Sequence, residues 1–433
     1  MIKVALEMLW IERKKAIQFC LSITTMLCVL IVFLQFFTNP NLVQKLTLFD
    51  LIFLTESLMI ALLGFSILIV CVSLILYSFN YYMRTHSREI GLLKLAGLNY
   101  MQIVFYQFIQ IIVIICVAYI LCFLISLFLI PLSLYVIYHF CGIHQSIFFY
   151  SKKLIGMILM MFPIILIIIL GLQIRYTLGH SISSLMKQYQ STESREIVHA
   201  LHIPDFLYIV GYFLGLYTMF IGEELSAGFA IASCIGAISA YGLFYHFIPH
   251  TIEEMLSDLS LKGETYVILG DLSLFIQKSR MFIIFIMLAI ILLPTFILSA
   301  VNTKLLYISL HISVVLVNII LSSSLISRFS IDDYEKKNHF FNLYKIGLTK
   351  DEVMKIAIKE IHYFYTILWI FTGIYIISIY IAFYLRTFLN IKIAFIILLE
   401  FMVPYIFSYI IVYISRRRRL HELFRNTEFN KDL

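Results

Sequence analysis

The sequence has few charged residues. Only 13% of its 433 residues are Asp, Glu, Lys or Arg, whereas 62% are hydrophobic, and the mean hydropathy is +0.97. A soluble globular protein needs far more polar surface than this, so that class is excluded and the composition predicts an integral membrane protein. The apolar runs of about 20 residues have the length of spanning helices, and they lack the alternation of a membrane strand. We therefore predict an all-α polytopic fold.

Sequence motifs for metals, nucleotides and catalysis are also absent. The seven cysteines lie mostly within apolar runs and none forms a CxxC pair, which argues against a disulfide scaffold or a thiolate metal site. No His, Cys and carboxylate cluster has metal-ligand spacing, and no nucleophile has a recognisable base. The phosphate-binding pattern GxxxxGK[ST] does not occur. We expect no metal, cofactor or catalytic residue on this chain, and any ATP hydrolysis would come from a partner.

Ten apolar segments have the length and composition of membrane-spanning helices. The segments are residues 17–37, 51–78, 104–136, 153–173, 206–222, 227–247, 281–300, 305–327, 361–385 and 392–414. With the N-terminus inside, the outer loops hold only six of the 32 Lys and Arg residues, so the positive-inside rule predicts that both termini are cytoplasmic. The basic runs 13–15 and 416–419 fit ordinary anchors at the inner interface, with anionic-lipid sites as the alternative.

A charged, glycine-containing segment lies between two of the apolar runs. Residues 87–103 read SREIGLLKLAGLNYMQI, and the spacing of apolar and charged residues predicts a short amphipathic helix that ends at Gly97. A related sequence, FFNLYKIGLTKDEV, occurs at 340–353, where Gly347 aligns with Gly97 at an offset of 250 residues. The repeat predicts two four-span units separated by a two-span insert with its linker. The three parts are residues 1–205, 206–280 and 281–433.

The stretch REIGLLKLAGLNYMQI resembles the signature of FtsX-like permeases, the MacB-type membrane subunits of ABC transporters. The resemblance implies that segments 87–103 and 338–353 contain coupling helices, which dock on a separate cytoplasmic ATPase. It implies docking contacts by Arg88, Glu89, Gly91, Lys94 and Gly97 in the first copy and by Leu343, Lys345, Gly347, Asp351 and Glu352 in the second. Without the resemblance, an interfacial helix lying on the inner leaflet is the alternative.

The arrangement of four, two and four spans is most similar to the BceB branch of that family. Members of this branch defend cells against antimicrobial peptides that act on the cell wall. The present chain has only residues 301–304 where that branch has a large extracellular domain.

Three of the polar side chains within the predicted spans are candidates for function, because burial in lipid is costly. They are Glu56, His311 and Glu400. The two carboxylates are candidates to receive a cationic peptide, and hydrogen bonding between helices is the alternative. An intramembrane enzyme would need a catalytic pair among these three residues, so that class is disfavoured.

The predicted function is that of a permease subunit in a bacterial cell membrane, coupled to an ABC ATPase dimer that uses ATP and Mg²⁺. We expect it to serve export of, or immunity to, peptides of the bacteriocin or lantibiotic type by mechanotransmission. The alternatives are a non-transporting signalling partner of a sensor histidine kinase and an exporter of lipid or haem. The expected partners are the ATPase, membrane lipids and a peptide substrate, and no nucleic acid.

Overall fold

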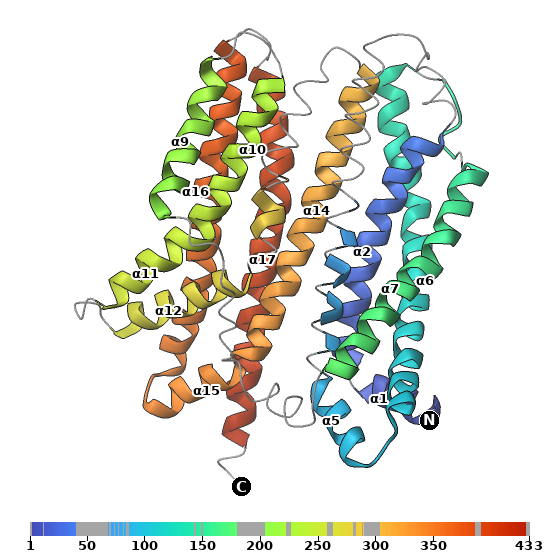
Figure 1. The fold of residues 1–433 in the computed structure, drawn as a ribbon, viewed down its shortest axis with the longest axis vertical. Helices are drawn as coiled ribbons and strands as arrows, with labels where there is room; N and C mark the ends of the chain where they lie inside the picture. The colour runs from blue at the N-terminus through green and yellow to red at the C-terminus, as the bar shows by residue number, and fades with distance from the viewer. Residues whose placement is uncertain are drawn as a thin grey trace. The chain divides into compact units, whose positions relative to one another are not determined.

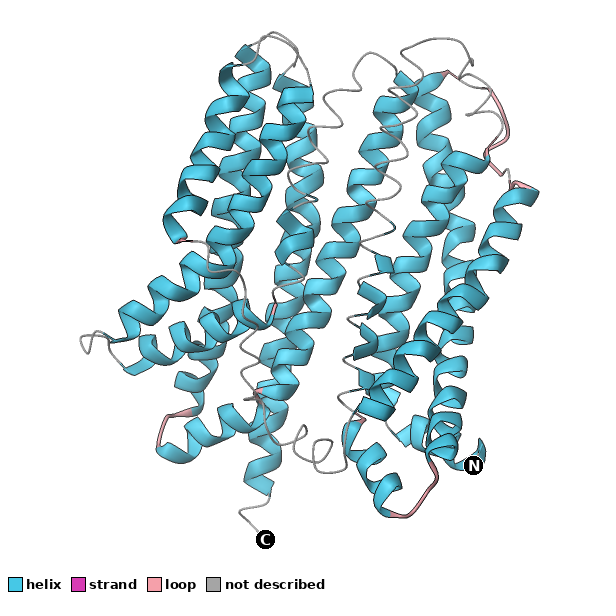
Figure 2. Cartoon of the chain, in the orientation of Figure 1, coloured by secondary structure: helices cyan, strands magenta, loops and turns pink. Residues whose placement is uncertain are grey.

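The computed structural model describes most of the chain. The described residues are 2–11, 13–39, 86–142, 144–148, 150–179, 204–221, 227–257, 263–279, 304–385 and 391–429, with short stretches between 68 and 83 and between 283 and 289. Within these ranges the chain forms α-helices and one π-helical turn, with no β-strand (Figure 2). The prediction of an all-α polytopic membrane protein is confirmed.

Six helices of the described part are long and apolar enough to cross a membrane. They contain the segments Ala16–Gln35, Tyr100–Phe140, Lys152–Gly179, His311–Asp333, Lys350–Ala382 and Phe395–Arg425. Each overlaps one of the ten predicted spans. Of the other four, 51–78 and 281–300 fall largely outside the described residues, and the insert forms the shorter helices α9 (Asp205–Ile221) and α10 (Ala227–Gly242).

The chain divides into two compact units. Unit 1 comprises Met1–Val198 with Lys304–Ile312, and unit 2 comprises His199–Thr303 with Ser313–Leu433. The predicted insert, 206–280, therefore belongs to the same compact unit as the C-terminal helices. The division of the chain into two repeated four-span units and an insert stays a prediction.

Unit 1 is built around α6 (Tyr100–Cys141), a helix of 42 residues with Pro131 in its interior. The helices α2 (Arg13–Thr38) and α7 (Lys152–Gly179) pack against α6 and against each other. The short helices α1 (Ile2–Ile11) and α5 (Ser87–Leu95) lie at one end of these long helices (Figure 1). Long apolar runs fold as helices because a helix satisfies its backbone hydrogen bonds within the segment, as a lipid environment requires.

Unit 2 contains α9 to α12, most of α14, and α15 to α17. Helix α10 continues through the π-helical turn Leu243–Phe247 into α11 (Ile248–Ser257), against which α12 (Gly263–Lys278) packs. The helices that follow are α14 (Lys304–Glu335), α15 (Lys337–Ile346), α16 (Lys350–Leu385) and α17 (Ile391–Phe429). Helix α16 is central in this unit because it packs against α9, α12, α15 and α17.

Small residues allow the insert helices to pack closely. A Cβ atom at Gly211 in α9 would clash with Oγ of Ser239 in α10, and a Cβ at Gly236 in α10 would clash with the hydroxyl oxygen of Tyr375 in α16. Membrane helices associate through such close approaches because lipid supplies no hydrophobic driving force between them. The glycines of the insert therefore allow α10 to approach both α9 and α16 closely.

Candidate functional site

The first predicted coupling segment folds as a short helix, a tight turn and the start of a long helix. Helix α5 ends at Leu95, Gly97 follows with φ +81°, and α6 begins three residues later. The amide of Leu98 donates to the carbonyl of Leu93 at 3.2 Å, which closes the C-terminus of α5. Residue 97 is glycine because side-chain-bearing residues rarely adopt this left-handed conformation. The segment 87–103 thus contains α5 and the first turn of α6.

The second segment has the same backbone arrangement. Helix α15 ends at Ile346, Gly347 has φ +116°, and α16 begins three residues later. The amide of Leu348 donates to the carbonyl of Leu343 at 3.3 Å, as its counterpart does in the first copy. The aligned glycines therefore perform the same task in both copies, which is to end the short helix and turn the chain into the long one.

A side-chain cap starts the long helix in each copy. The amide of Asn99 donates to Oε1 of Gln102 at 3.0 Å, and the amide of Thr349 donates to Oε2 of Glu352 at 2.7 Å. The amide of Glu352 in turn donates to Oγ1 of Thr349 at 3.3 Å, which completes a capping box. Each cap fixes the direction in which α6 or α16 leaves the turn.

The exposed tip of the first copy is apolar. Leu92 and Leu95 of α5 are 50% and 60% exposed, and Met101 in the first turn of α6 is 72% exposed. Ile90, on the opposite face of α5, is buried. A short helix that is anchored on one face and apolar on the other is suited to fill a groove on a partner protein.

Some of the residues that the family resemblance assigns to the docking contact do not face outward. Gly91 is buried and Glu89 is half-buried, whereas the side chain of Arg88 lies outside the described part of α5. The Nζ of Lys94 donates to the carbonyl of Thr177 at 2.9 Å, which ties α5 to the C-terminal turn of α7. Burial lowers the pKa of Lys94. Gly91 and Lys94 therefore support α5 from within the chain, and direct contact with a partner stays a prediction for all five residues.

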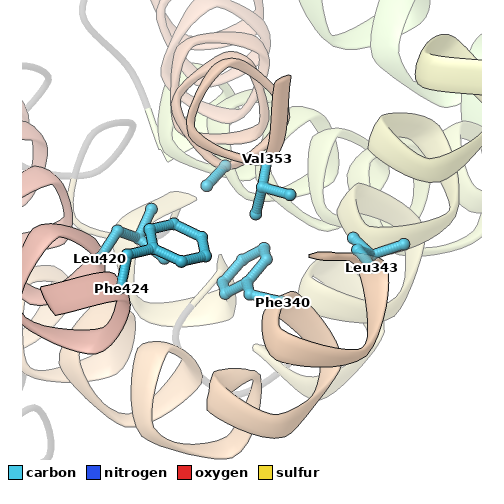
Figure 3. Close-up of a cluster of buried hydrophobic side chains, with 6 residues drawn as sticks. Phe340, Leu343, Val353, Leu420 and Phe424 are labelled. Carbon is cyan, nitrogen blue, oxygen red and sulfur yellow. The ribbon is translucent and has the colours of Figure 1, made fainter. Parts of the chain in front are cut away.

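A hydrophobic cluster fixes α15 to the long helices of unit 2. Figure 3 shows Phe340 of α15 directed toward Val353 of α16 and toward Leu420 and Phe424 of α17. The buried members are Phe340, Leu343, Val353, Ala357, Leu420 and Phe424. Burying an aliphatic or aromatic side chain contributes about 1.5–3 kcal/mol, so α15 is firmly seated. Leu343, a predicted contact residue, lies inside this cluster.

The outward face of α15 carries the other predicted contact residues. Ile346 is 80% exposed, and the neighbouring Lys345 lies with its Nζ 4.6 Å from the ring centre of Phe341. Gly347 and Asp351 are exposed, and Glu352 is engaged in the cap of α16. The tip of the second copy is thus more polar than that of the first, with a single exposed isoleucine at its end.

The polar candidates within the spans do not form a described site. His311 is buried beside Tyr307, with ring centres 4.3 Å apart, and it belongs to unit 1. Glu400 is partly exposed on α17 in unit 2, and Glu56 lies outside the described residues. Among the residues that the structure describes, no group of three or more His, Cys, Asp and Glu side chains could hold a metal ion.

A comparison with protein families finds a match in the part of the chain that contains α5. Residues 61–182 match the family model described as FtsX-like permease C-terminal, and this range contains α5, α6 and α7. No curated protein matches the chain.

Proposed function

We propose that this chain, whose residues 61–182 form an FtsX-like permease domain, is the membrane subunit of an ABC transporter and works with a separate cytoplasmic ATPase. FtsX-like permeases generally work with such an ATPase. The observation that carries the proposal is the repeated turn at Gly97 and Gly347, which joins a short exposed helix to a long apolar one in each copy. Such a helix can convert movement of a docked protein into tilting of the long helix.

The same proposal places both termini, α5 and α15 in the cytoplasm of a bacterial cell. The distribution of Lys and Arg among the loops supports this orientation, because basic residues gather on the cytoplasmic side of membrane proteins. ATP and Mg²⁺ would be used by the partner, since the chain contains no phosphate-binding loop.

Charging the exposed tips tests the proposal. The full chain in lipid nanodiscs would be combined with the ABC ATPase encoded nearest to it, and ATP hydrolysis would be measured. We expect the wild-type chain to stimulate hydrolysis. In the variant Leu95→Asp/Ile346→Asp this stimulation should be reduced about tenfold or more, which is equivalent to about 1.4 kcal/mol. The loss follows because a carboxylate at each tip would be desolvated on docking.

The matched control is Met255→Asp on α11, which charges a side chain that is also exposed (58%) but lies outside both coupling segments. This control should leave stimulation unchanged. Equal stimulation by the wild type and the doubly charged variant would reject α5 and α15 as coupling helices.

For the substrate, we propose a cationic antimicrobial peptide of the bacteriocin or lantibiotic type, displaced or exported at the outer leaflet. The family branch that the sequence resembles supports this class. Glu400 also supports it, since this carboxylate is partly exposed on a face of α17 that carries exposed Ile396, Leu399 and Val403. A cationic amphipathic peptide offers both an apolar face and a positive charge to such a surface.

Neutralising this carboxylate tests the substrate proposal. Cells that produce Glu400→Gln should be inhibited by the cationic lantibiotic nisin at a lower concentration than wild-type cells, with the same amount of permease in the membrane. Glu422→Gln, which removes an exposed carboxylate from the far end of α17, is the matched control and should retain resistance. Undiminished resistance in the Glu400 variant would make that carboxylate structural, and induction of resistance genes without protection would favour a signalling role.

A further inference from the structure

The joint between α14 and α15 contains a buried ring of charges. Lys336, the single residue between these helices, is 8% exposed, and its Nζ lies 3.1 Å from Oδ2 of Asp332 and 2.5 Å from Oε1 of Glu360. Arg416 of α17 closes the ring, with Nη2 at 3.0 Å from the same Asp332 oxygen and Nη1 at 2.8 Å from Oε2 of Glu360. The charge ring therefore consists of two cations and two carboxylates, Lys336, Asp332, Arg416 and Glu360.

Further contacts tie the ring to its surroundings. The Nζ of Lys336 donates to the backbone carbonyl of Asp271 in α12 at 3.4 Å, and Nη1 of Arg416 donates to the carbonyl of Ala357 in α16 at 3.2 Å. Arg416 also pairs with Asp333. Burial by itself would lower the pKa of Lys336, but attraction by the nearby carboxylates raises it overall, so the lysine is a cation at neutral pH. The joint is thus connected to α12, α14, α16 and α17.

The first copy has no such ring at the aligned positions. At the offset of 250 residues, Asp332, Lys336 and Glu360 correspond to Tyr82, His86 and Gln110. The described contacts among these include no ion pair: the Tyr82 hydroxyl donates to Oε1 of Gln110 at 3.5 Å, and Nδ1 of His86 lies 2.8 Å from the carbonyl of Tyr82. Positions 82 and 110 carry no carboxylate, so the two joints differ in charge while sharing the same backbone arrangement.

We infer that the charge ring is a positioning device that makes the second coupling helix rigid with α16 and α17, whereas the first coupling helix has a more compliant joint. Bending at Lys336 would separate buried opposite charges, and an uncompensated buried charge is strongly unfavourable. The hydrophobic cluster around Phe340 holds the buried face of α15, and the charge ring holds its N-terminal end. The rigidity itself depends only on this chain, and its use in coupling rests on the proposed function.

Hydrogen exchange of the full chain in nanodiscs tests the rigidity without any partner. In the wild type, we expect amides 336–346 to exchange at least about tenfold more slowly than amides 86–96, because exchange reports local opening. The variant Lys336→Met/Glu360→Gln removes one charge of each sign at nearly constant length. It should speed exchange at 336–346 to a rate close to that of 86–96. Glu360→Gln alone, which keeps the hydrogen-bonding shape, serves if the double variant does not fold, and it should give an intermediate increase.

The matched control is Lys278→Met/Glu335→Gln. Glu335 lies one residue before the joint, and Nζ of Lys278 in α12 lies 3.4 Å from its Oε2. Both side chains are partly exposed, so removal of this pair should leave exchange at 336–346 unchanged. Unchanged exchange in the ring variant, or an equal increase in this control, would overturn the rigid joint.

Stimulation of the partner ATPase then tests the use of the rigid joint. The ring variant should lose stimulation although the amount of folded permease and its binding to the ATPase are preserved, and Lys336→Arg should retain stimulation because it keeps the cation. Full stimulation despite a loosened α15 would overturn the positioning role. If the wild-type chain stimulates no ATPase, the proposed function fails, and the exchange measurement still decides whether the joint is rigid.

Discussion

At the scale of single residues, the place of a charge in the fold decides its role. Arg416 begins the run Arg416–Arg419, which the sequence suggests is an anchor at the membrane interface. Its side chain is 1% exposed and pairs with carboxylates of α14 and α16, so the anchor interpretation is wrong for Arg416. Arg418 in the same run is 82% exposed and pairs only with Glu422 one turn later at 3.4 Å in the described contacts. A solvated ion pair of that kind contributes about 0–1 kcal/mol.

We expect His339 on α15 to make the stability of unit 2 depend on pH. Its Nε2 lies 3.4 Å from Oδ2 of Asp271, and the interaction with this carboxylate raises the pKa of His339 above the usual value near 6.5. Burial and the cation of Lys336 oppose this rise, and the carboxylate of Glu360 adds to it. Because the folded state binds the proton more tightly, the stabilisation is complete below about pH 6.5 and is lost as pH rises through the folded pKa.

Thermal unfolding of the full chain in detergent between pH 5.5 and pH 8.5 would measure this effect. As pH rises over this range, we expect the melting temperature of the wild type to fall more than that of His339→Gln. The two curves of melting temperature against pH should meet at the alkaline end. Asp271→Asn should flatten the curve in the same way because it removes the partner carboxylate. Parallel curves for the wild type and the histidine variant would contradict the assignment.

At the scale of helices, local sequence was sufficient for most of the fold. Apolar runs gave the long helices because length and composition alone decide whether a segment can span lipid. Gly97 and Gly347 marked the ends of α5 and α15 because a left-handed residue is a local requirement. The start of α6 was less predictable: it begins at Tyr100, four residues before the predicted span 104–136, because the cap at Asn99 adds a polar first turn to the helix.

The charge ring could not be predicted in this way. Lys336, Glu360 and Arg416 lie on the joint and on two further helices, and no local pattern states that they meet. Glu360 stands one residue before the predicted span 361–385, where a carboxylate fits an ordinary helix end, so its position in the sequence does not mark it as buried. The available signal was Asp332 four residues before Lys336, which places opposite charges on one helix face. Only packing of α16 and α17 shows that this pair is buried.

At the scale of the whole molecule, the two copies share a backbone arrangement and differ in how firmly it is held. The tip of α5 is apolar and its joint is made by Tyr82, His86 and Gln110, whereas α15 is seated by the hydrophobic cluster and the charge ring. A loosely jointed helix can bind a partner without passing on much of its movement. A rigidly jointed helix must pass movement to α16 and α17 because it cannot bend separately.

This difference predicts unequal effects of the same substitution in the two copies. Leu95→Asp should raise the Kd for the ATPase by about tenfold, or about 1.4 kcal/mol, while maximal stimulation at saturating ATPase is retained. Ile346→Asp should also raise the Kd, but it should lower maximal stimulation as well, since, in the proposed function, it disturbs the contact through which the rigid helix would be moved. Titration of the nanodisc-embedded chain with the ATPase separates the two quantities. Equal loss of maximal stimulation in both variants would mean that the copies transmit movement equally, whatever the difference between their joints.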